Sequence, residues 1–220
     1  MKIIITGASS GIGRRAAERY IEKGHFVYGI DIAEGTVNDS NYKHFTADIR
    51  DKNSLPDITD ADILFNNAGV QNSGADIETN LFGTINVTEK YVESNKNLIS
   101  VLFNASASSV TGQEFAEYAA SKAGVAGYMK NTAIRLAPRG VTVNAVSFGG
   151  VYTESNAPVI NDPGCFEKIM DVTPLKRWMT EDEAADWILF LTLVNRSMSG
   201  QNLLIDNGEA ELNPTFVWKD

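Results

Sequence analysis

Short apolar runs alternate with amphipathic segments along the whole chain. Seven runs are almost continuously apolar, which is typical of strands buried on both faces of a sheet. These runs cover residues 2–6, 25–31, 42–48, 61–67, 98–104, 141–147 and 201–206. Apolar residues recur at helical spacing over residues 13–24, 77–93, 115–137 and 180–194. The alternation predicts a parallel sheet of about seven strands with helices on both faces.

The fold class predicted from this order is α/β, with a doubly wound, Rossmann-like sheet, because crossovers between parallel strands are right-handed. The chain has 220 residues and no repeat or linker divides it, so we expect a single domain over residues 1–220. Ligands of such sheets bind beyond the carboxyl ends of the strands. Residues that directly follow a strand are therefore the first candidates for function.

Two helix ends carry local signals. Gly24 follows the last apolar position of the first helix and is expected to end it. Thr180 precedes the last long helix and Glu183 stands three residues later, which is the pattern of a capping box. Both signals support the helix boundaries that the apolar spacing predicts.

A glycine-rich segment, TGASSGIG, links the first strand to the first helix. Gly7, Gly11 and Gly13 let the backbone approach a pyrophosphate, and the helix N-terminus presents free N–H groups to it. Ser9 and Ile12 lie in the same turn and are expected to contact the nucleotide together with the glycines. The spacing differs from the common G-x-G-x-x-G fingerprint, so a plain glycine-rich turn is the alternative.

An aspartate at the end of the second strand bears on the choice of cofactor. Asp31 stands 18 positions after the last glycine of TGASSGIG. A carboxylate there accepts hydrogen bonds from a ribose diol and repels a 2′-phosphate, so it favours NAD over NADP. Arg14 and Arg15 follow the glycine segment and keep NADP open as the less favoured cofactor. Asp48, after the third strand, is expected to reach an adenine amino group, and Ile49 beside it is expected to contact the same part of the cofactor.

The segment YAASK, from Tyr118 to Lys122, places a phenol and an ammonium four residues apart, on one face of a helix. By itself this is an ordinary surface tyrosine beside a solvated lysine. However, TGASSGIG, NNAG and YAASK follow one another along the chain, each after a predicted strand. With these motifs the chain resembles the classical short-chain dehydrogenase/reductase family, from Lys2 to about Gly208. The segments NAVSFGGVYT and SGQNLLIDNG also resemble that family.

The resemblance implies a nicotinamide cofactor and four catalytic side chains, at positions 80, 106, 118 and 122. Tyr118 would exchange a proton with the substrate oxygen, and Lys122 would lower the pKa of this tyrosine. Ser106 would orient the substrate oxygen, and Asn80 would hold a water that links Lys122 to solvent. Ser108 is the alternative serine, because one deletion in its loop would change the register.

The resemblance also implies further contacts with the cofactor. Residues expected there are Asn66, Ala68 and Gly69 of NNAG, Tyr118 and Lys122, and Val151 and Thr153 of GGVYT. Two connections are shorter than the family pattern, one between the third and fourth strands and one of ten residues between Gly69 and Asn80, where a helix is expected to be missing. Phe148 stands where a proline is usual and leaves the shape of the nicotinamide pocket open.

Composition and charge narrow the range of partners. The formal net charge is −9, and nucleic-acid or anionic-membrane binding favours basic patches, so neither partner is expected. No apolar run reaches the length of a membrane span. One cysteine, Cys165, cannot form an internal disulfide, which fits a cytoplasmic protein. His25 and His44 cluster with no other ligand, so no metal site is expected.

The function that these features favour is the NAD(H)-dependent interconversion of a secondary alcohol and a ketone. Two alternatives stay open, an NADP(H)-dependent 3-oxoacyl-thioester reductase and a dinucleotide-binding protein without turnover. The partly apolar segment of residues 153–180 is expected to close over the small-molecule substrate. The apolar or small faces of the helices over residues 77–93 and 115–137 predict a homodimer or homotetramer paired through them.

Overall fold

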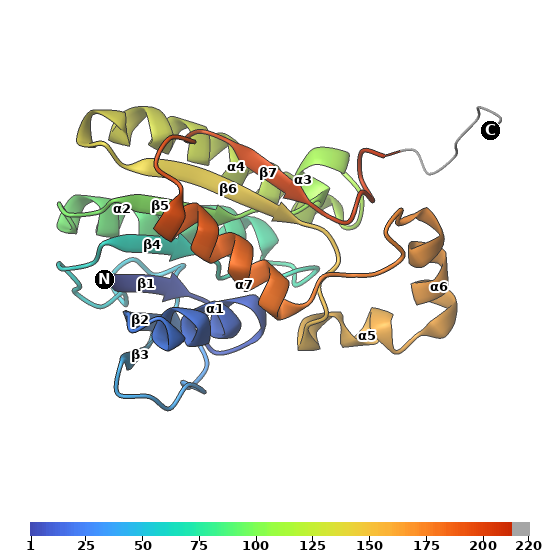
Figure 1. The fold of residues 1–220 in the computed structure, drawn as a ribbon, viewed down its shortest axis with the longest axis horizontal. Helices are drawn as coiled ribbons and strands as arrows, with labels where there is room; N and C mark the ends of the chain where they lie inside the picture. The colour runs from blue at the N-terminus through green and yellow to red at the C-terminus, as the bar shows by residue number, and fades with distance from the viewer. Residues whose placement is uncertain (213–220) are drawn as a thin grey trace.

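The computed structural model describes residues 1–212, so the last eight positions of the predicted domain lie outside the described residues. Seven parallel strands form one sheet in the order β3-β2-β1-β4-β5-β6-β7 (Figure 1). Their bounds are β1 Lys2–Thr6, β2 Phe26–Asp31, β3 Tyr42–Thr46, β4 Ile63–Asn66, β5 Ser100–Asn104, β6 Thr142–Phe148 and β7 Asn202–Ile205. The predicted doubly wound α/β sheet is confirmed, and each predicted strand overlaps an observed one.

Helices cover both faces of the sheet (Figure 1). α1 (Gly11–Glu22) and α7 (Glu181–Leu189) pack side by side on one face. α2 (Thr84–Ser94) and α4 (Ala116–Leu136) cover the other face. The remaining helical segments are η1 Ile77–Gly83, α3 Ser108–Thr111, η2 Ala137–Arg139, η3 Glu154–Asn156, α5 Ala157–Ile160, α6 Pro163–Val172 and η4 Phe190–Val194. The four long predicted helices are confirmed. Two of them contain a wider π-helical stretch at one end, because η1 leads directly into α2 and η4 continues α7.

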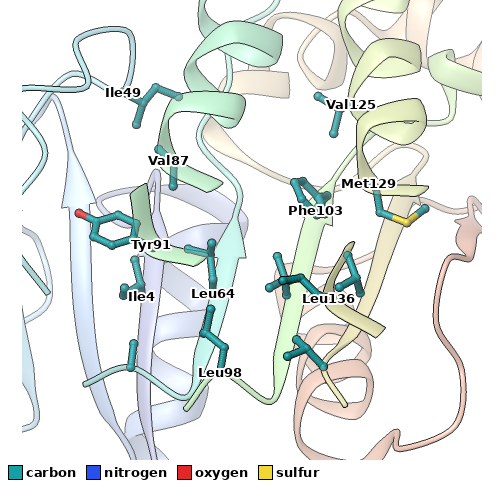
Figure 2. Close-up of a cluster of buried hydrophobic side chains, with 14 of the residues drawn as sticks. Ile4, Ile49, Leu64, Val87, Tyr91, Leu98, Phe103, Val125, Met129 and Leu136 are labelled. Carbon is teal, nitrogen blue, oxygen red and sulfur yellow. The ribbon is translucent and has the colours of Figure 1, made fainter. Parts of the chain in front are cut away.

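Alternate residues of the strands form two cores, one on each face of the sheet. In β1, Ile3 and Ile5 face α1 and α7, whereas Ile4 faces α2 and α4, and all three are fully buried. Figure 2 shows the second core, to which Tyr91 of α2 and Met129 of α4 contribute. Each fully buried side chain of this kind stabilises the fold by about 1.5–3 kcal/mol relative to an exposed one. Burial on both faces is the reason that central strands such as β1 and β4 are nearly continuous apolar runs in the sequence.

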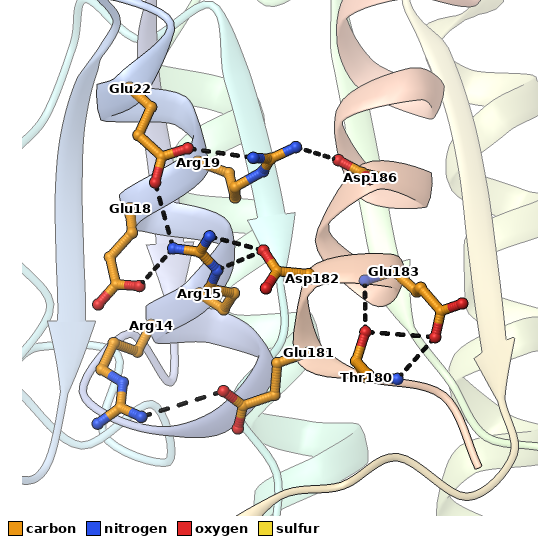
Figure 3. Close-up of polar contacts among 10 residues, drawn as sticks. All are labelled: Arg14, Arg15, Glu18, Arg19, Glu22, Thr180, Glu181, Asp182, Glu183 and Asp186. Carbon is orange, nitrogen blue, oxygen red and sulfur yellow. Dashed lines mark hydrogen bonds and ion pairs between the residues drawn. The ribbon is translucent and has the colours of Figure 1, made fainter. Parts of the chain in front are cut away.

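Charged side chains join α1 to α7 at the surface (Figure 3). Arg15 contacts Asp182 at 2.6 Å, and Arg19 contacts Asp186 at 2.5 Å. Because the carboxylates are more than half exposed, each pair contributes at most about 1 kcal/mol to stability. The pairs therefore help to align the two helices, whereas the buried apolar contacts provide most of the stability.

Both predicted helix ends are confirmed. After α1, Gly24 adopts a φ of +77°, a left-handed conformation that residues other than glycine rarely adopt. At the start of α7, Thr180 Oγ1 accepts a hydrogen bond from the Glu183 N–H at 3.2 Å (Figure 3). The Glu183 carboxylate in turn accepts from the Thr180 N–H at 2.9 Å, which completes the capping box.

Two connections are as short as expected. Residues 47–62, between β3 and β4, contain no helix, and residues 70–75 lead from β4 toward η1 without one. The first connection contributes to the core that α2 and α4 cover, where Leu55, Ile58 and Ala61 are buried. The second connection starts at the carboxyl end of β4, so its residues lie next to those that follow the other central strands.

Candidate active site

The strand order reverses between β1 and β4, and this switch point joins the ends of three strands. Thr6 Oγ1, at the end of β1, accepts from the N–H groups of Asn67 and Ala68 at 3.0 and 3.1 Å. Asn67 Oδ1 accepts from Asn104 Nδ2, at the end of β5, at 2.9 Å. Asn67 is not among the predicted site residues. The sequence marks it only as the second asparagine of NNAG. In doubly wound sheets, ligands bind at such a switch point.

The glycines of TGASSGIG are required by close backbone packing at this edge. A β-carbon added to Gly13 would lie 2.0 Å from the carbonyl oxygen of Gly7, and one added to Gly7 would lie 2.8 Å from Cα of Ala68. Gly7 and Gly11 also have φ values of +68° and +50°, where other residues are strained. Glycine at these positions lets the turn place the N-terminus of α1 at the switch point.

The N-terminus of α1 offers hydrogen-bond donors. No acidic side chain lies in its first turn, and N–H groups such as that of Ile12 have no partner within the helix. The Oγ of Ser9 is buried and has no hydrogen-bond partner among residues 1–212. Thr153 reaches this turn from the segment after β6, since a β-carbon on Gly11 would lie 3.6 Å from Thr153 Cγ2. The residues predicted to hold a pyrophosphate are thus together.

Asp31 joins the glycine turn to the segment after β2. Its Oδ2 accepts from the Ser9 N–H at 3.0 Å, and its Oδ1 accepts from the Ala33 N–H at 3.0 Å. From the same segment, Thr36 Oγ1 donates to the Ser9 carbonyl at 2.7 Å. The carboxylate is therefore fixed beside the glycine turn, which is the position that the predicted ribose contact requires.

Asp48 and Ile49, after β3, have side-chain partners within the protein. The Asp48 carboxylate accepts from the Arg50 guanidinium at 2.6–3.0 Å, and this pairing lowers the pKa of Asp48. The Ile49 side chain is buried against η1, where a β-carbon on Gly83 would lie 2.7 Å from it. The predicted adenine contact at Ile49 could therefore come only from its main chain, and the Asp48 carboxylate would have to share its oxygens with Arg50.

The NNAG segment contains a buried carboxamide without a partner. Asn66 is buried at the end of β4, and neither its Oδ1 nor its Nδ2 has a hydrogen-bond partner in the part of the chain that the structure describes. An unpaired buried amide is costly, so its presence indicates a polar group supplied from outside the chain. Gly69 of the same segment packs closely against two predicted catalytic side chains, since a β-carbon there would lie 2.9 Å from Asn80 Oδ1 and 3.2 Å from Lys122 Nζ.

Lys122 is buried within the site. Its Nζ donates to the carbonyl of Asn104 at 2.8 Å and lies 5.8 Å from the centre of the Tyr118 ring. Burial lowers the pKa of Lys122 to about 8, because the charged form loses its hydration, and the negative charge of Asp76 acts in the opposite direction. The ammonium is thus held near Tyr118 in a place where water screens its charge little.

Tyr118 has a raised pKa, and the expectation that Lys122 lowers it stays a prediction. Burial is the main cause of the raised pKa; Ser106 lowers the pKa, and the negative charges of Glu114 and Asp76 raise it further. Desolvation of the phenolate therefore dominates in a place where the ammonium of Lys122 lies 5.8 Å from the ring centre. Tyr118 and Lys122 do share one face of α4, as their spacing predicts.

Ser106, rather than Ser108, lies beside Tyr118. Ser106 lies close enough to Tyr118 to lower the pKa of the phenol, and its Oγ accepts from the Ser108 N–H at 3.2 Å. The Ser108 Oγ instead donates to Glu114 Oε2 at 2.6 Å. The structure thus brings Ser106, Tyr118 and Lys122 together.

Asn80 positions the segment after β4. Its Oδ1 accepts from the Val70 N–H at 2.7 Å, and its Nδ2 donates to the Val70 carbonyl at 2.8 Å and to Ser121 Oγ at 2.9 Å. Both amide protons are used within the protein, and Ser121 is the neighbour of Lys122 on α4. The side chain therefore ties η1 to α4, and its part in a water link to Lys122 stays a prediction.

The segment after β6 has its apolar side chains in the core. Phe148 is the last residue of β6 and packs in the core beneath α7, where it is 5% exposed. Val151 is buried in the same core and forms an isolated parallel bridge with Met179. Phe148 therefore lengthens β6 and does not reshape the pocket through its side chain.

The segment expected to cover a substrate, residues 153–180, folds into η3, α5 and α6. In Figure 1 these helices lie beyond the carboxyl ends of the strands. The rings of Tyr152, Phe166 and Trp178 pack together with centroid distances of 5.2–6.1 Å. This aromatic cluster joins the start of the segment to its end.

Two kinds of feature are absent from the described residues 1–212. No group of three or more His, Cys, Asp or Glu side chains is arranged to hold a metal ion. No helix in this part of the chain combines the length and the apolar character needed to cross a membrane.

Known proteins resemble the chain over almost its whole length. Residues 7–209 match the family described as Enoyl-(Acyl carrier protein) reductase. A 3-oxoacyl-(acyl-carrier-protein) reductase of Thermotoga maritima is 30% identical, over 93% of this chain and 96% of that protein. A glucose 1-dehydrogenase of Gluconobacter oxydans is 29% identical, over 94% of this chain and 91% of that protein. The structure of a short chain dehydrogenase/reductase family oxidoreductase from Burkholderia thailandensis superposes with a TM-score of 0.87 at 26% identity, covering 96% of this chain and 93% of that one.

Proposed function

The chain belongs to the short-chain dehydrogenase/reductase family of oxidoreductases that act on CH–OH groups, and we propose that it interconverts a secondary alcohol and a ketone with NAD(H). The observation that carries this proposal is the meeting of Ser106, Tyr118 and Lys122, with Lys122 close to Gly69 of NNAG. The end of β5 and the helix α4 thus supply a hydroxyl, a phenol and an ammonium to one buried place.

The residues around this place fit a dinucleotide. The N–H groups at the start of α1 would hold the pyrophosphate, and Asp31 would accept from a ribose. The buried Ser9 Oγ and Asn66 carboxamide, which have no hydrogen-bond partner among residues 1–212, offer further polar contacts. When bound, the nicotinamide ring gives or takes the hydride, and its oxidised form adds a positive charge.

Proton transfer is assigned to Tyr118. Its hydroxyl would give a proton to the substrate oxygen during ketone reduction and take one during alcohol oxidation. Ser106 would donate a hydrogen bond to the same oxygen and so orient the reacting carbon. The charge of Lys122, 5.8 Å from the ring centre, favours the phenolate by at most about 3 kcal/mol at an effective dielectric of about 20. Because burial raises the pKa of Tyr118, alcohol oxidation is expected to speed up as the pH rises.

A cofactor-depletion assay tests the proposed function. The purified chain is mixed with NAD(H) or NADP(H) and a panel of secondary alcohols, ketones and 3-oxoacyl thioesters, and the absorbance of the reduced nicotinamide is followed. Turnover of alcohols or ketones with NAD(H) supports the proposal. Binding of either dinucleotide without turnover of any panel member would show a dinucleotide-binding protein instead, although the buried tyrosine and lysine together favour an enzyme.

The second candidate is an NADP(H)-dependent 3-oxoacyl-thioester reductase. Several similar proteins carry the name 3-oxoacyl-(acyl-carrier-protein) reductase. Asp31 is the observation that favours NAD(H), because its carboxylate is fixed beside the glycine turn. In the assay, turnover restricted to 3-oxoacyl thioesters with NADPH would select this candidate.

Asp31 also gives a prediction about affinity. We expect NAD to bind more tightly than NADP, and Asp31→Ala to reduce the difference, because the carboxylate repels a 2′-phosphate. Calorimetric titration with both dinucleotides measures the ratio of the two affinities. Asp39→Ala is the control, since it removes an exposed carboxylate from the same connection and should leave the ratio unchanged. Equal or reversed affinities in the parent protein would refute the preference.

The two serines give a second prediction. Ser106→Ala is expected to lower the initial rate at least about tenfold more than Ser108→Ala, because Ser106 acts on Tyr118 whereas the Ser108 hydroxyl donates to Glu114. Both variants are assayed on a substrate that the parent accepts, with melting temperatures to confirm that each is folded. The opposite ranking would transfer the orienting role to Ser108.

We also propose a homodimer or homotetramer with two-fold symmetry, paired through η1, α2 and α4. Phe82 of η1 and Ile134 of α4 are 55% and 75% exposed, and monomers rarely leave large apolar areas open. Closed symmetric assemblies are the commonest oligomers. Light scattering after gel filtration measures the mass, and a value near 23.9 kDa at micromolar concentration would exclude the assembly.

A further inference from the structure

A polar bridge lies beside the proposed catalytic residues. Gln71 donates through Nε2 to Glu114 Oε2 at 3.0 Å, and Ser108 donates through Oγ to the same oxygen at 2.6 Å. Gln71 follows β4, Ser108 follows β5, and Glu114 precedes α4. Glu114 therefore lies where three segments of the site meet.

Glu114 is close to the atoms that would react. Ser108 links it to Ser106, whose Oγ accepts from the Ser108 N–H at 3.2 Å. Its negative charge also acts on Tyr118. The backbone of Glu114 has a φ of +69°, a conformation that costs energy for any residue except glycine. Such strain, at a side chain with two protein donors, indicates that the carboxylate is held in one place.

The chemistry of a carboxylate limits what it can bind. It only accepts hydrogen bonds, and both protein donors use Oε2, so Oε1 has no hydrogen-bond partner among residues 1–212. Glu114 is exposed to solvent, so a ligand can reach it. A hydroxyl group on the substrate can donate to this oxygen, whereas the apolar chain of an acyl thioester would leave it unpaired.

Further negative charges surround the bridge. Asp76 acts on Tyr118 together with Glu114. Glu209 has a pKa raised by burial and then by the charges of Asp206 and Glu114, so these carboxylates also lie close by. An anionic group on a substrate would be repelled here, and a neutral group rich in hydroxyls would not.

We propose that Glu114 determines specificity by accepting a hydrogen bond from a hydroxyl group next to the reacting carbon, so that the preferred substrates are diols and polyhydroxylated alcohols. Gln71 and Ser108 act as positioning residues, because they fix the carboxylate from two sides. The inference rests on the proposed function, since it needs alcohol oxidation at Tyr118. It adds the substrate class, which the catalytic side chains do not define.

The experiment compares matched alcohols that differ by one hydroxyl. Butane-2,3-diol with butan-2-ol, and cyclohexane-1,2-diol with cyclohexanol, are oxidised with NAD by the parent, by Glu114→Gln and by Glu117→Gln. We expect the parent to prefer each diol in kcat/KM, and Glu114→Gln to reduce this preference at least about tenfold, since a hydrogen bond to a charged group is lost. Glu117→Gln is the control, because it removes an exposed charge in the first turn of α4, three residues after Glu114, and it should keep the preference for the diols.

Each other outcome has a definite meaning. Equal kcat/KM for both members of the pairs in the parent, or an unchanged preference in Glu114→Gln, would overturn the inference and leave the proposed function standing. A preference for 1-aminopropan-2-ol over the diols would show that the Glu114 carboxylate binds a cationic group, and it would overturn the inference. Turnover of 3-oxoacyl thioesters without oxidation of any diol would also overturn the inference. Absence of turnover of every compound with both cofactors would overturn the proposed function, and the inference with it.

Discussion

Replacing Tyr118 by phenylalanine is expected to lower turnover at least about a hundredfold, the usual scale for loss of an acid–base group, while the protein stays folded and binds its cofactor. The ring remains in place beside Lys122, and only the hydroxyl, on whose pKa Ser106 acts, is removed. Without this hydroxyl, the proton would have to come from water. Initial rates in both directions, together with calorimetric cofactor affinity, measure the effect.

Tyr128→Phe is the matched control for this experiment. Tyr128 lies on the same helix, but its hydroxyl donates to Glu89 at 2.5 Å, on the side of α4 that faces α2. The control therefore removes a phenol hydroxyl from α4 without touching the site, and it should turn over like the parent. A Tyr118→Phe variant whose turnover stays within about threefold of the parent would show that the acid–base assignment is wrong.

Lys122→Met is expected to lower turnover at least about a hundredfold and, at neutral pH, to raise the free energy of unfolding. The pKa of Lys122 falls from 10.5 to about 8 on folding, which corresponds to about 3 kcal/mol of disfavoured charge. Losing the hydrogen bond to the Asn104 carbonyl offsets about 1 kcal/mol of this gain. A net stabilisation of about 2 kcal/mol is therefore expected from a change that removes function.

The pH dependence follows from the direction of this shift. Below pH 8, Lys122 is charged in both the folded and the unfolded chain, so the folded protein bears the whole cost of the buried charge. As the pH rises from about 8 to 10.5, the folded chain is neutral at Lys122 while the unfolded chain still binds the proton, and the parent gains stability. The advantage of the methionine variant should thus be largest below pH 8 and shrink above it.

Urea denaturation of the parent and the variant at several pH values measures this difference. Lys130→Met is the control, because Lys130 is exposed on the same helix and its loss should change stability little at any pH. A Lys122→Met protein that is less stable than the parent at pH 7 would show that the ammonium stabilises the fold, contrary to the prediction.

The sequence by itself determined the sheet and its helices. Strands buried on both faces are largely apolar at consecutive positions, and β1 is the clearest case, since Ile3, Ile4 and Ile5 are all fully buried. Helix ends were equally visible, because a capping box such as that of Thr180 and Glu183 is made within four residues of chain. These features depend on neighbours in the sequence or on a simple period, so they can be predicted without knowing the fold.

The sequence also predicted which segments would carry the site. Parallel strands place their carboxyl ends at one edge, so TGASSGIG, NNAG and YAASK had to come near one another once the strand order was known. The need for glycine was partly predictable too, from the turn between β1 and α1. That a β-carbon on Gly13 would collide with the carbonyl of Gly7 appears only in three dimensions.

The tertiary structure alone decided which side chains contact one another and in which direction the pKa of each titratable group is shifted. Ser106 and Ser108 are two residues apart in the sequence, yet one contacts Tyr118 and the other Glu114. Asn67, absent from the predicted site, joins the ends of β1 and β5. Burial raises the pKa of Tyr118, an effect that the spacing of Tyr118 and Lys122 does not reveal. Desolvation and contacts between distant segments determine these properties, and both depend on which groups surround a side chain in space, which the order of residues along the chain does not state.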